Sequence, residues 1–339
     1  MLAVKYLGPN SIQPIDVPMP EASEEEAIVK VEACGFCGSD LGIVAGVHPR
    51  AKGPLTLGHE FCGRIEQINS TTSDLKVGDQ VTAYPLISCG HCFACRHGAA
   101  HVCRTLRLFG FDADGAMAEY VRLPVNSLLR LPAEMSPFVG AVVEPLAVAV
   151  HGVSRSPIDS AKHVLVMGAG PIGLLTALVA RSRGAPSVYI SDILPSRLAL
   201  AQNLGLHGVV AGPELKAFVD QETSQDGVDL LFECTGAPSA AKEMTELVRC
   251  RGTIVNLGVF KKSVEVDMQA INFKEISLLG SRVYTRDDFQ EAVRLASVLP
   301  IRKIVTHSFP LREVQAAFEV FRQGTDVCKV LIMPNGAHE

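Results

Sequence analysis

The middle of the chain alternates short apolar runs with longer stretches of helical periodicity. Residues 164–167 have the length and composition of a buried strand, and residues 174–183 repeat apolar positions with helical spacing. Residues 187–191 form a second strand-like run. Further runs of this kind occur at residues 228–233, 252–258 and 276–281. A strand–helix repeat is typical of a parallel sheet covered by helices, so we predict an α/β fold with a doubly wound parallel sheet.

The flanking parts of the chain have short strands separated by turns that are rich in glycine. The clearest strands are residues 27–33 and 63–68, and this pattern favours a small, mostly β domain. Residues 34–40 are glycine-rich, which predicts a tight turn with an exposed thiol at Cys37. Helical periodicity returns at residues 287–299 and 311–322, and residues 327–332 form a last strand.

Composition fits a two-domain enzyme and argues against several other classes of protein. The chain has 339 residues, of which 47% are hydrophobic and 20% charged, and this length is typical of about two domains. The net charge of −5 argues against a general nucleic-acid binder or a basic membrane-surface protein. No apolar run reaches about 18 residues, so no membrane-spanning helix is expected, and residues 1–9 do not resemble a signal peptide. Half of the ten cysteines have metal-ligand spacing, which favours a reducing, cytoplasmic location.

A glycine-rich turn connects the first central strand to its helix. Gly168 permits a tight turn, Gly170 lets the backbone approach a pyrophosphate, and Gly173 lets the helix pack closely on the strand. Asp192 ends the second strand, about 20 residues further on, where a carboxylate accepts the ribose 2′-hydroxyl of NAD. A glycine turn without a ligand is the alternative, and the acid at this spacing argues against it.

Other residues are expected at the nucleotide because ligands of such sheets bind beyond the carboxyl ends of the strands. Arg197 follows Asp192 closely and is expected near the same ribose. The full predicted set is Gly168, Gly170, Pro171, Ile172, Gly173, Asp192, Arg197, Thr235, Leu257, Gly258 and Val259.

Four cysteines close together predict a structural metal site. They are Cys89, Cys92, Cys95 and Cys103, and four thiolates at this spacing can surround one tetrahedral zinc ion. Disulfide bonds are the alternative, which the reducing location disfavours. A zinc-ribbon contact with nucleic acid is also disfavoured, because aromatic residues that stack on bases are scarce nearby.

A second group of donors combines sulfur, nitrogen and oxygen. It consists of Cys37, His59, Glu60 and Glu144. Pro145 suits the first position of a helix, so Glu144 is expected at a helix start within an apolar stretch, where an unpaired carboxylate is costly. A catalytic zinc commonly has three protein ligands and one open position. Taken singly, these residues also fit a core thiol, a hydrogen-bonded histidine or a helix cap, but their joint occurrence beside a dinucleotide motif favours a catalytic metal.

Together these motifs identify a resemblance to a known family. The chain resembles the zinc-containing medium-chain dehydrogenases, in particular the sorbitol, butanediol and threonine dehydrogenase branch, over essentially its whole length. The segments that carry the resemblance are residues 35–40, 58–60, 115–120, 144–146 and 168–173, together with the four-cysteine lobe.

The resemblance implies a domain organisation, cofactors and residue roles. A GroES-like catalytic domain is expected from residues 1–146 and 285–339, with a structural zinc lobe at 86–108, and an NAD-binding Rossmann domain from 147–284. Cys37, His59 and Glu144 are then ligands of a catalytic zinc, Glu60 is an adjacent carboxylate that ligates directly or through water, and the lobe holds a second zinc. We also expect a homo-oligomer, either a dimer or a tetramer.

The residues around the substrate depart from the family at one place. Gly42 stands close to where relatives often have a histidine or tyrosine, so the route of the proton is open. Ser39 is the candidate relay, and His48 is a second candidate whose alternative is a surface histidine. Arg50 and Lys52 have solvated surface positions as the alternative to a substrate contact, and Arg282 is expected near substrate hydroxyls only by the resemblance.

The predicted function is oxidation of a secondary alcohol by hydride transfer to NAD, with zinc as a Lewis acid. The substrate is expected to be a small molecule: a polyol, a sugar acid or a vicinal diol. One alternative is oxidation of an amino alcohol, as in L-threonine 3-dehydrogenase. An alternative of another class is a non-catalytic NAD(H)-binding protein, but such a protein has no use for an open zinc site.

Overall fold

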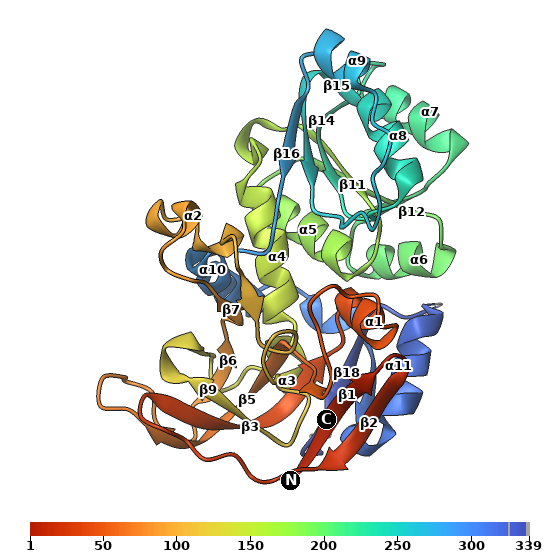
Figure 1. Ribbon diagram of the computed structural model, residues 1–339. Coiled ribbons are helices and arrows are strands. Elements are labelled where there is room, and N and C mark those ends of the chain that lie inside the picture. The colour runs from red at the N-terminus through yellow and green to blue at the C-terminus, as the bar shows by residue number, and fades with distance from the viewer. Residues whose placement is uncertain (325, 337–339) are drawn as a thin grey trace. The chain divides into compact units, whose positions relative to one another are not determined.

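The computed structural model describes residues 1–324 and 326–336. The chain divides into two compact units, which Figure 1 shows coloured by position in the sequence. Unit 1 consists of Met1–Glu144 and Thr285–Glu339, and unit 2 is Pro145–Tyr284. Unit 1 is therefore built from two separate stretches of sequence, whereas unit 2 is continuous.

Unit 2 contains a six-stranded, all-parallel sheet. Its strand order is β13-β12-β11-β14-β15-β16, which is the order of dinucleotide-binding folds. Successive strands are added outward on one side from β11 to β13 and on the other side from β14 to β16, so the strand order switches between β11 and β14. The strands are β11 (His163–Met167), β12 (Ser187–Asp192), β13 (His207–Val210), β14 (Val228–Glu233), β15 (Val248–Asn256) and β16 (Ser277–Gly280).

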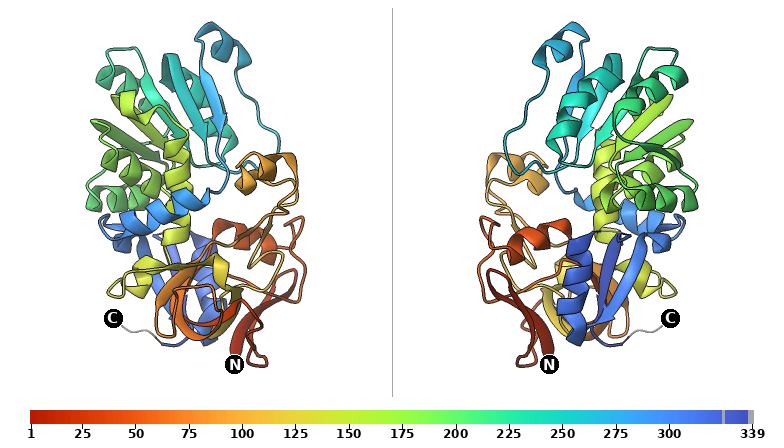
Figure 2. Two further views of the ribbon diagram at one scale, coloured as in Figure 1. Left: turned by 90° about the vertical axis from the view of Figure 1, so that its left-hand side faces the viewer. Right: turned by 90° about the vertical axis from the view of Figure 1, so that its right-hand side faces the viewer.

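Proline residues fix where the helices of unit 2 begin. Four of these helices start with a proline, a residue whose missing N–H costs nothing in the first turn and whose φ already suits a helix. The helices are α4 (Val143–Ser154, which begins in unit 1), α5 (Pro171–Ser182), α6 (Pro195–Asn203), α7 (Pro213–Glu222), α8 (Pro238–Leu247) and α9 (Met268–Phe273), with the 3₁₀ helix η3 (Ile158–Ser160). Helices α5, α6 and α8 pack against the sheet (Figure 2).

The central strands of the unit 2 sheet have apolar, buried side chains along most of their length. In β11, Val164, Leu165 and Val166 have no exposed surface, and in β14 neither do Leu231 and Phe232. Each such side chain contributes about 1.5–3 kcal/mol by its burial. Burial on both faces explains why the central strands are uninterrupted apolar runs in the sequence.

Unit 1 is mostly β-structure. Its main sheet has the order β10-β6-β5-β3-β18-β17, and β9 also pairs with β3. Strand β3 is its centre, with Ala27, Ile28 and Val29 almost completely buried. The strands are β1 (Leu2–Gly8), β2 (Ser11–Asp16), β3 (Glu26–Gly35), β4 (Leu55–Thr56), β5 (Glu60–Asn69), β6 (Gln80–Ala83), β7 (Leu86–Ile87), β8 (Arg107–Leu108), β9 (Tyr120–Pro124), β10 (Leu128–Arg130), β17 (Val305–Pro310) and β18 (Lys329–Met333).

The helices of unit 1 are short in its first stretch and longer in its second. Helix α10 begins with a capping box in which Thr285 accepts the N–H of Asp288, and α11 ends at Gly324, whose φ of 68° is left-handed. The helices are α1 (Gly38–Val44), α2 (Phe93–Arg96), α3 (Pro137–Gly140), α10 (Arg286–Ala296) and α11 (Val314–Gln323), with the 3₁₀ helices η1 (Ala100–Val102), η2 (Val125–Ser127), η4 (Ile301–Ile304) and η5 (Leu311–Glu313).

Two local expectations were wrong. Residues 34–40 do not form a tight turn: β3 continues to Gly35, and Cys37 is the N-cap of α1, where its thiol is partly buried. Helix α4 begins at Val143, so Pro145 is its third residue and not its first. The helix tolerates this because the first N–H groups of a helix have no partner within it.

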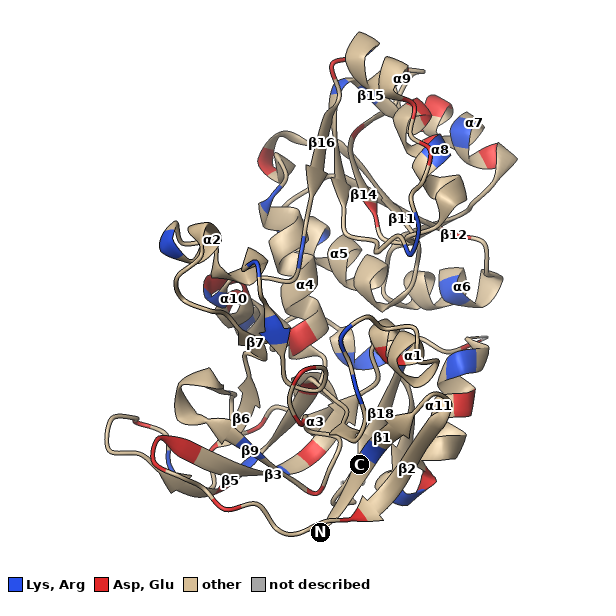
Figure 3. Ribbon diagram, in the orientation of Figure 1, with Lys and Arg blue, Asp and Glu red and all other residues tan. Residues whose placement is uncertain are grey.

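Charged residues are interspersed along the helices of both units, as Figure 3 shows. Within residues 1–324 and 326–336, no helix has the length and apolar character needed to cross a membrane.

Candidate metal and cofactor sites

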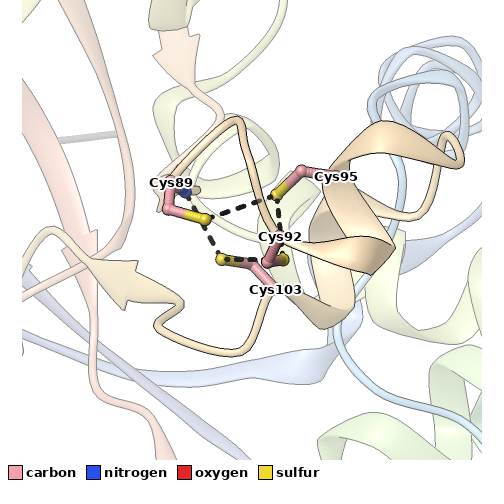
Figure 4. A group of neighbouring side chains, drawn as sticks. All are labelled: Cys89, Cys92, Cys95 and Cys103. Atoms are coloured by element: carbon pink, nitrogen blue, oxygen red, sulfur yellow. Dashed lines mark hydrogen bonds between the residues drawn. The ribbon is translucent and has the colours of Figure 1, made fainter.

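The four cysteines of the lobe converge on one point in unit 1. Cys92 caps α2, Cys95 lies within this helix, and Cys103 follows η1. The sulfur–sulfur distances are 3.9 Å for Cys89–Cys95, 3.5 Å for Cys92–Cys95 and 3.9 Å for Cys92–Cys103 (Figure 4). Sulfurs that surround a metal at about 2.3 Å are roughly 3.8 Å apart, whereas disulfide sulfurs are about 2.05 Å apart. The four thiols therefore fit a tetrahedral zinc ion.

Backbone hydrogen bonds favour the charged form of two of these thiols, Cys92 and Cys103. The N–H of Cys89 donates to the sulfur of Cys103 at 3.3 Å. Backbone hydrogen bonds from Arg104 and Cys95 lower the pKa of Cys92. A thiolate is the form that binds zinc, so the lobe backbone is arranged for metal binding.

A second compact group in unit 1 is formed by Cys37, His59 and Glu60. One sulfur, one nitrogen and one oxygen from these residues all lie within 4.8 Å of one another. His59 and Glu60 are almost completely buried, at 4% and 2% exposure. His59 directly precedes β5, and Glu60 is its first residue. The start of β5 and the start of α1 thus supply the donors.

The surroundings of His59 are rich in negative charge. Burial opposes its charged form, but the hydrogen bond and charge of Cys37, with the charges of Glu144 and Asp40, raise the pKa of His59 to about 10. Glu144 is not part of the compact group, although its charge acts on it, and it is itself only 5% exposed. Negative groups concentrated in a buried place fit a divalent metal ion, and the donor types fit zinc.

Unpartnered polar atoms lie beside this group. Among the described residues, the Oγ of Ser39, the Oδ1 of Asp40 and the Nδ1 of His59 are buried and have no hydrogen-bond partner. Ser39, the candidate relay, thus has a buried hydroxyl two residues after Cys37 in the chain. Asp40 was not expected: its carboxylate accepts the N–H of Cys37 at 2.9 Å, and burial raises its pKa to about 6.

The predicted substrate residues are less closely gathered. The half-buried ring of His48 contacts Phe111 at 5.2 Å between ring centres, and Phe111 lies edge-on to His59 at 4.8 Å. Arg50 is 3.3 Å from the carboxylate of Asp112 and also donates to the Leu106 carbonyl, so its charge is already paired. Lys52 is exposed in unit 1, and Arg282 is exposed after β16 in unit 2.

The predicted nucleotide residues of unit 2 meet at one edge of its sheet. Met167, Ser191, Glu233 and Asn256 pair side by side at the carboxyl ends of their strands. Asp192 is the last residue of β12, and beyond the strand ends follow Gly168, Thr235, Leu257, Gly258 and Val259. This is the edge at which such sheets bind ligands.

The glycine turn has the geometry that close backbone approach requires. Gly168 has a φ of 98°, a conformation that favours glycine. At Gly173 a Cβ atom would lie 1.7 Å from the carbonyl oxygen of Gly168, so helix α5 packs on the turn without space for a side chain. At Gly170, the N-cap of α5, a Cβ would have no neighbour within 4 Å. Pro171 and Ile172 form the first turn of this helix.

Asp192 is held by the glycine turn itself. Its carboxylate accepts the N–H of Ala169 at 2.8 Å and that of Leu194 at 2.9 Å. Arg197 in α6 is 3.6 Å from the same carboxylate. The buried Nε of Arg197 has no partner among the described residues.

A buried glutamate, which the sequence analysis did not single out, fixes the neighbouring loops. Glu233 has no exposed surface and accepts the N–H groups of Thr235 at 2.7 Å and of Gly236 at 3.1 Å. A Cβ at Gly258 would lie 2.2 Å from its Oε2. The backbone carbonyl of Glu233 accepts the N–H groups of Leu257 and Gly258, both at 2.8 Å, so this residue joins the ends of β14 and β15.

Comparison with known families places the chain in one of them. Residues 23–133 match the alcohol dehydrogenase GroES-like domain, and residues 171–297 match the zinc-binding dehydrogenase family. The chain belongs to the zinc-binding dehydrogenases of the medium-chain type, a family of alcohol and polyol dehydrogenases. This confirms the family resemblance, the α/β fold with a GroES-like domain and the assignment as an enzyme.

Relatives with assigned activities cover most of the chain. A 2-dehydro-3-deoxy-L-galactonate 5-dehydrogenase of Pseudoalteromonas atlantica is 34% identical, with 94% of each chain covered. An L-threonine 3-dehydrogenase of Bacillus subtilis is 33% identical, again over 94% of each chain. A sorbitol dehydrogenase of Halalkalibacterium halodurans is 34% identical, also over 94% of each chain.

Solved structures of the family contain either nucleotide. A zinc-binding dehydrogenase from Sinorhizobium meliloti bound to NADP has a TM-score of 0.90 and 34% identity, covering 98% of this chain and 99% of its own. An alcohol dehydrogenase from E. coli CFT073 complexed with NADH has a TM-score of 0.90 and 30% identity, with the same coverage.

Proposed function

We propose that this protein is an NAD-dependent and zinc-dependent dehydrogenase that oxidises a secondary alcohol of a polyol, sugar acid or vicinal diol to the ketone. The observation that carries the proposal is the buried group of Cys37, His59 and Glu60, which offers three different donor atoms within 4.8 Å of one another. A protein that only bound NAD(H) would gain nothing from burying such donors.

The two units take different parts of this function. We assign residues 1–146 and 285–339 to a catalytic domain and residues 147–284 to an NAD-binding domain. Two zinc ions are proposed for each chain: a structural ion in the four-cysteine lobe, and a catalytic ion held by Cys37 and His59 with a carboxylate from Glu60 or Glu144.

The chain's residues position the substrate oxygen and handle its proton. When bound, zinc supplies a Lewis acid that lowers the pKa of the substrate hydroxyl, and NAD⁺ accepts the hydride. Asp40 fixes the backbone N–H of Cys37, and with it the direction of the thiolate. The hydroxyl of Ser39 has no hydrogen-bond partner among the described residues. It would accept the proton of the substrate hydroxyl while it gives up its own proton toward the ribose of the coenzyme. His48 is a second candidate for releasing this proton.

The coenzyme is proposed to be NAD. The carboxylate of Asp192 already accepts two backbone N–H groups, which fix its position beside the glycine turn. A negative charge at this place suits a ribose 2′-hydroxyl and repels a 2′-phosphate. Arg197 beside it offsets part of this repulsion.

The carboxylates favour substrates with several hydroxyl groups. Glu60 and Glu144 offer oxygen acceptors in a buried place, and a simple alcohol such as ethanol leaves these acceptors unpaired, which is costly. Relatives that act on a sugar acid and on sorbitol are in keeping with this class. The similar threonine 3-dehydrogenase favours a second candidate, oxidation of an amino alcohol.

One experiment separates these candidates. Zinc content is measured first, and kcat/KM is then compared for sorbitol, a six-carbon aldonic acid, 2,3-butanediol, L-threonine and ethanol with NAD⁺. We expect a polyol, sugar acid or diol to exceed ethanol by about 5- to 150-fold, because an unpaired buried acceptor costs about 1–3 kcal/mol. Highest activity with threonine selects the second candidate. Absence of turnover in fully zinc-loaded protein refutes the assignment.

An assembly of identical chains and a cytoplasmic location complete the proposal. Strand β16 is an edge of the unit 2 sheet, and Leu278 in it is exposed, as are Met268 and Phe273 nearby. Exposed edge strands with apolar side chains invite pairing with another chain, which supports a homodimer or a tetramer. A lobe of four reduced thiols supports a reducing compartment such as the cytoplasm.

A further inference from the structure

A buried carboxylate that has no cationic partner lies at the end of β14. Glu233 has no exposed surface. Its Oε1 accepts the N–H groups of Thr235 at 2.7 Å and Gly236 at 3.1 Å, and also the hydroxyl of Thr235. In the part of the chain that the structure describes, this carboxylate forms no ion pair with a lysine, arginine or histidine. Because an ionised group is costly to bury without an opposite charge, a cationic ligand close by would stabilise Glu233.

The hydrogen bonds of Glu233 do not require a charged side chain. Asn256 of β15, which pairs with Glu233 in register, holds its own loop with a neutral amide that donates to the carbonyl oxygen of Gly258 at 3.2 Å. A neutral glutamine in place of Glu233 could accept the same bonds at Oε1, since the Oε2 atom accepts only the N–H of Gly236, at 3.2 Å, among the described residues. The negative charge nevertheless acts on its surroundings, because together with burial it raises the pKa of the Cys234 thiol. The charge is therefore separable from the structural role.

Glycine residues cover the carboxylate thinly. A Cβ at Gly258 would lie 2.2 Å from the Oε2 of Glu233, and a Cβ at Gly236 would lie 2.7 Å from the carbonyl oxygen of Val259. Thr235 and Val259, which flank this cover, are exposed. A ligand placed against these loops can approach the buried charge closely, because the glycines have no side chain to keep it away.

The second half of the coenzyme is expected on these loops. A sheet of this kind has two mononucleotide-binding halves, and a dinucleotide lies across the point where the strand order switches. The glycine turn and Asp192 belong to the half formed by β11–β13 and are assigned to the adenosine side. The ends of β14–β16 are then left for the nicotinamide side, which places this ring in the neighbourhood of Glu233.

We propose that the buried charge of Glu233 selects the oxidation state of the coenzyme. The nicotinamide ring carries a positive charge in NAD⁺ and is neutral in NADH. Opposite charges attract more strongly where water is excluded, so Glu233 favours NAD⁺ over NADH, relative to a site without this charge. Hydride transfer adds one proton and two electrons to the ring and removes its positive charge, so the attraction ends with the reaction and NADH is released more easily. The proposal rests on the coenzyme site of the proposed function.

The test compares the coenzyme affinities of E233Q and the wild type. The Kd of NADH is measured by the fluorescence of NADH, and the Kd of NAD⁺ by its competition with NADH. The quantity reported is the ratio of the Kd of NAD⁺ to the Kd of NADH. Both forms carry the same pyrophosphate charges, so the repulsion between these charges and Glu233 cancels in the ratio. The ratio does not depend on turnover.

D229N is the matched control for the loss of one negative charge. Asp229 lies near the opposite end of the same strand, and its carboxylate also accepts backbone N–H groups, those of His163 at 2.8 Å and Lys162 at 3.0 Å. D229N is expected to lower stability and to leave the ratio unchanged. E233D keeps the charge at the nucleotide edge, so it is expected to keep the wild-type ratio even if its shorter side chain weakens both affinities.

E233Q is expected to raise the ratio about tenfold, which corresponds to 1.4 kcal/mol. An unchanged ratio in folded E233Q, an equal rise in D229N, or a rise in E233D as large as that in E233Q overturns the proposal. Glu233 would then serve only to join β14 and β15.

A second measurement uses the wild type and covers the case in which E233Q does not fold. Benzamide adenine dinucleotide has a neutral ring of the same shape as that of NAD⁺. A site without an attracting charge would bind this neutral analogue more tightly, because burial of a cation costs its hydration. We expect NAD⁺ to bind at least as tightly as the analogue, and tighter binding of the analogue overturns the proposal.

Failure of the proposed function has a different signature. Wild-type protein that binds neither NADH nor NADPH refutes the coenzyme site itself. If the protein binds NADPH alone, the assignment of NAD is wrong, but the ratio is still measured with NADP⁺ and NADPH, whose rings differ by the same charge.

Discussion

Two glycines of the same turn, three residues apart, are expected to respond to alanine in opposite ways. Gly173 lies in the first turn of α5, where an added Cβ would meet the carbonyl oxygen of Gly168 at 1.7 Å. Because both partners are backbone, the helix must move away from the turn. Gly170 has open space within 4 Å of an added Cβ, and its φ of −73° is one that alanine adopts freely. G173A therefore perturbs packing, whereas G170A perturbs only what binds there.

The magnitudes follow from this geometry. Alanine within a helix gains about 0.5–1 kcal/mol over glycine, and overpacking of a tight contact costs about 1–3 kcal/mol, occasionally more. A contact of 1.7 Å belongs at the upper end, so we expect G173A to lose about 2 kcal/mol, or about 5–10 °C in the melting temperature of unit 2. G170A is expected to stay within about 0.5 kcal/mol of the wild type. If its Cβ meets the pyrophosphate, NADH affinity falls at least about tenfold, or 1.4 kcal/mol.

The assay measures both quantities on each variant. Melting is followed by calorimetry without coenzyme, and the Kd of NADH by its own fluorescence, which is convenient because the chain has no tryptophan. Wild-type melting of G173A refutes the packing argument. Unchanged NADH affinity of G170A refutes the placement of the pyrophosphate at this turn.

Three further predictions concern the metals, the coenzyme and acid stability. C95S is expected to lose one zinc per chain and several degrees of melting temperature, whereas H59A is expected to lose mainly turnover. Equal destabilisation of the two variants, in samples of known metal content, contradicts the division into a structural and a catalytic site. kcat/KM is expected to be at least about tenfold higher with NAD⁺ than with NADP⁺. A higher kcat/KM with NADP⁺ contradicts the role of Asp192 at the ribose 2′-hydroxyl. Although burial opposes it, the N–H groups of His163 and Lys162 and the side chain of Arg249 lower the pKa of Asp229. A carboxylate whose pKa is lower in the folded than in the unfolded protein stabilises the fold above its unfolded pKa of about 4, and this stabilisation is lost as the pH falls through its folded pKa. D229N should therefore be about 1–2 kcal/mol less stable than the wild type at pH 7. In urea titrations this difference should close below about pH 4.

The continuous unit was predictable because its signals are local. The apolar runs of β11 and β14, the prolines at helix starts and the acid at Asp192 all lie within short windows of sequence. The prediction of a tight turn at residues 34–40 was wrong because pairing with β5 and β18 extends β3 to Gly35. Such long-range pairing overrides a local excess of glycine.

The sequence allowed the metal-ligating residues of the candidate site to be predicted, but not the residues that hold them in place. Cysteine, histidine and acidic residues at characteristic spacing pointed to both metal groups. Lys329, whose Nζ lies 2.6 Å from the Oε2 of Glu60, gave no such signal, because it stands at the start of an ordinary apolar strand and 269 positions separate it from Glu60. The buried Asp40 and Glu233 lie within motifs that drew attention to their neighbours, and only their burial and hydrogen bonds reveal what they do.

Because unit 1 is built from two separate stretches of sequence, its parts are synthesised at different times. Synthesis adds about 5–20 residues per second, so roughly 10–40 s pass between the completion of Glu144 and the addition of β18. Unit 2 is synthesised during this interval, while the last residues of β3 wait for the strand that will pair with Cys34 and Gly35. The nascent chain thus has an unpaired, apolar strand edge close to thiol and imidazole groups. At this stage we expect the chain to be prone to aggregation and to premature metal binding.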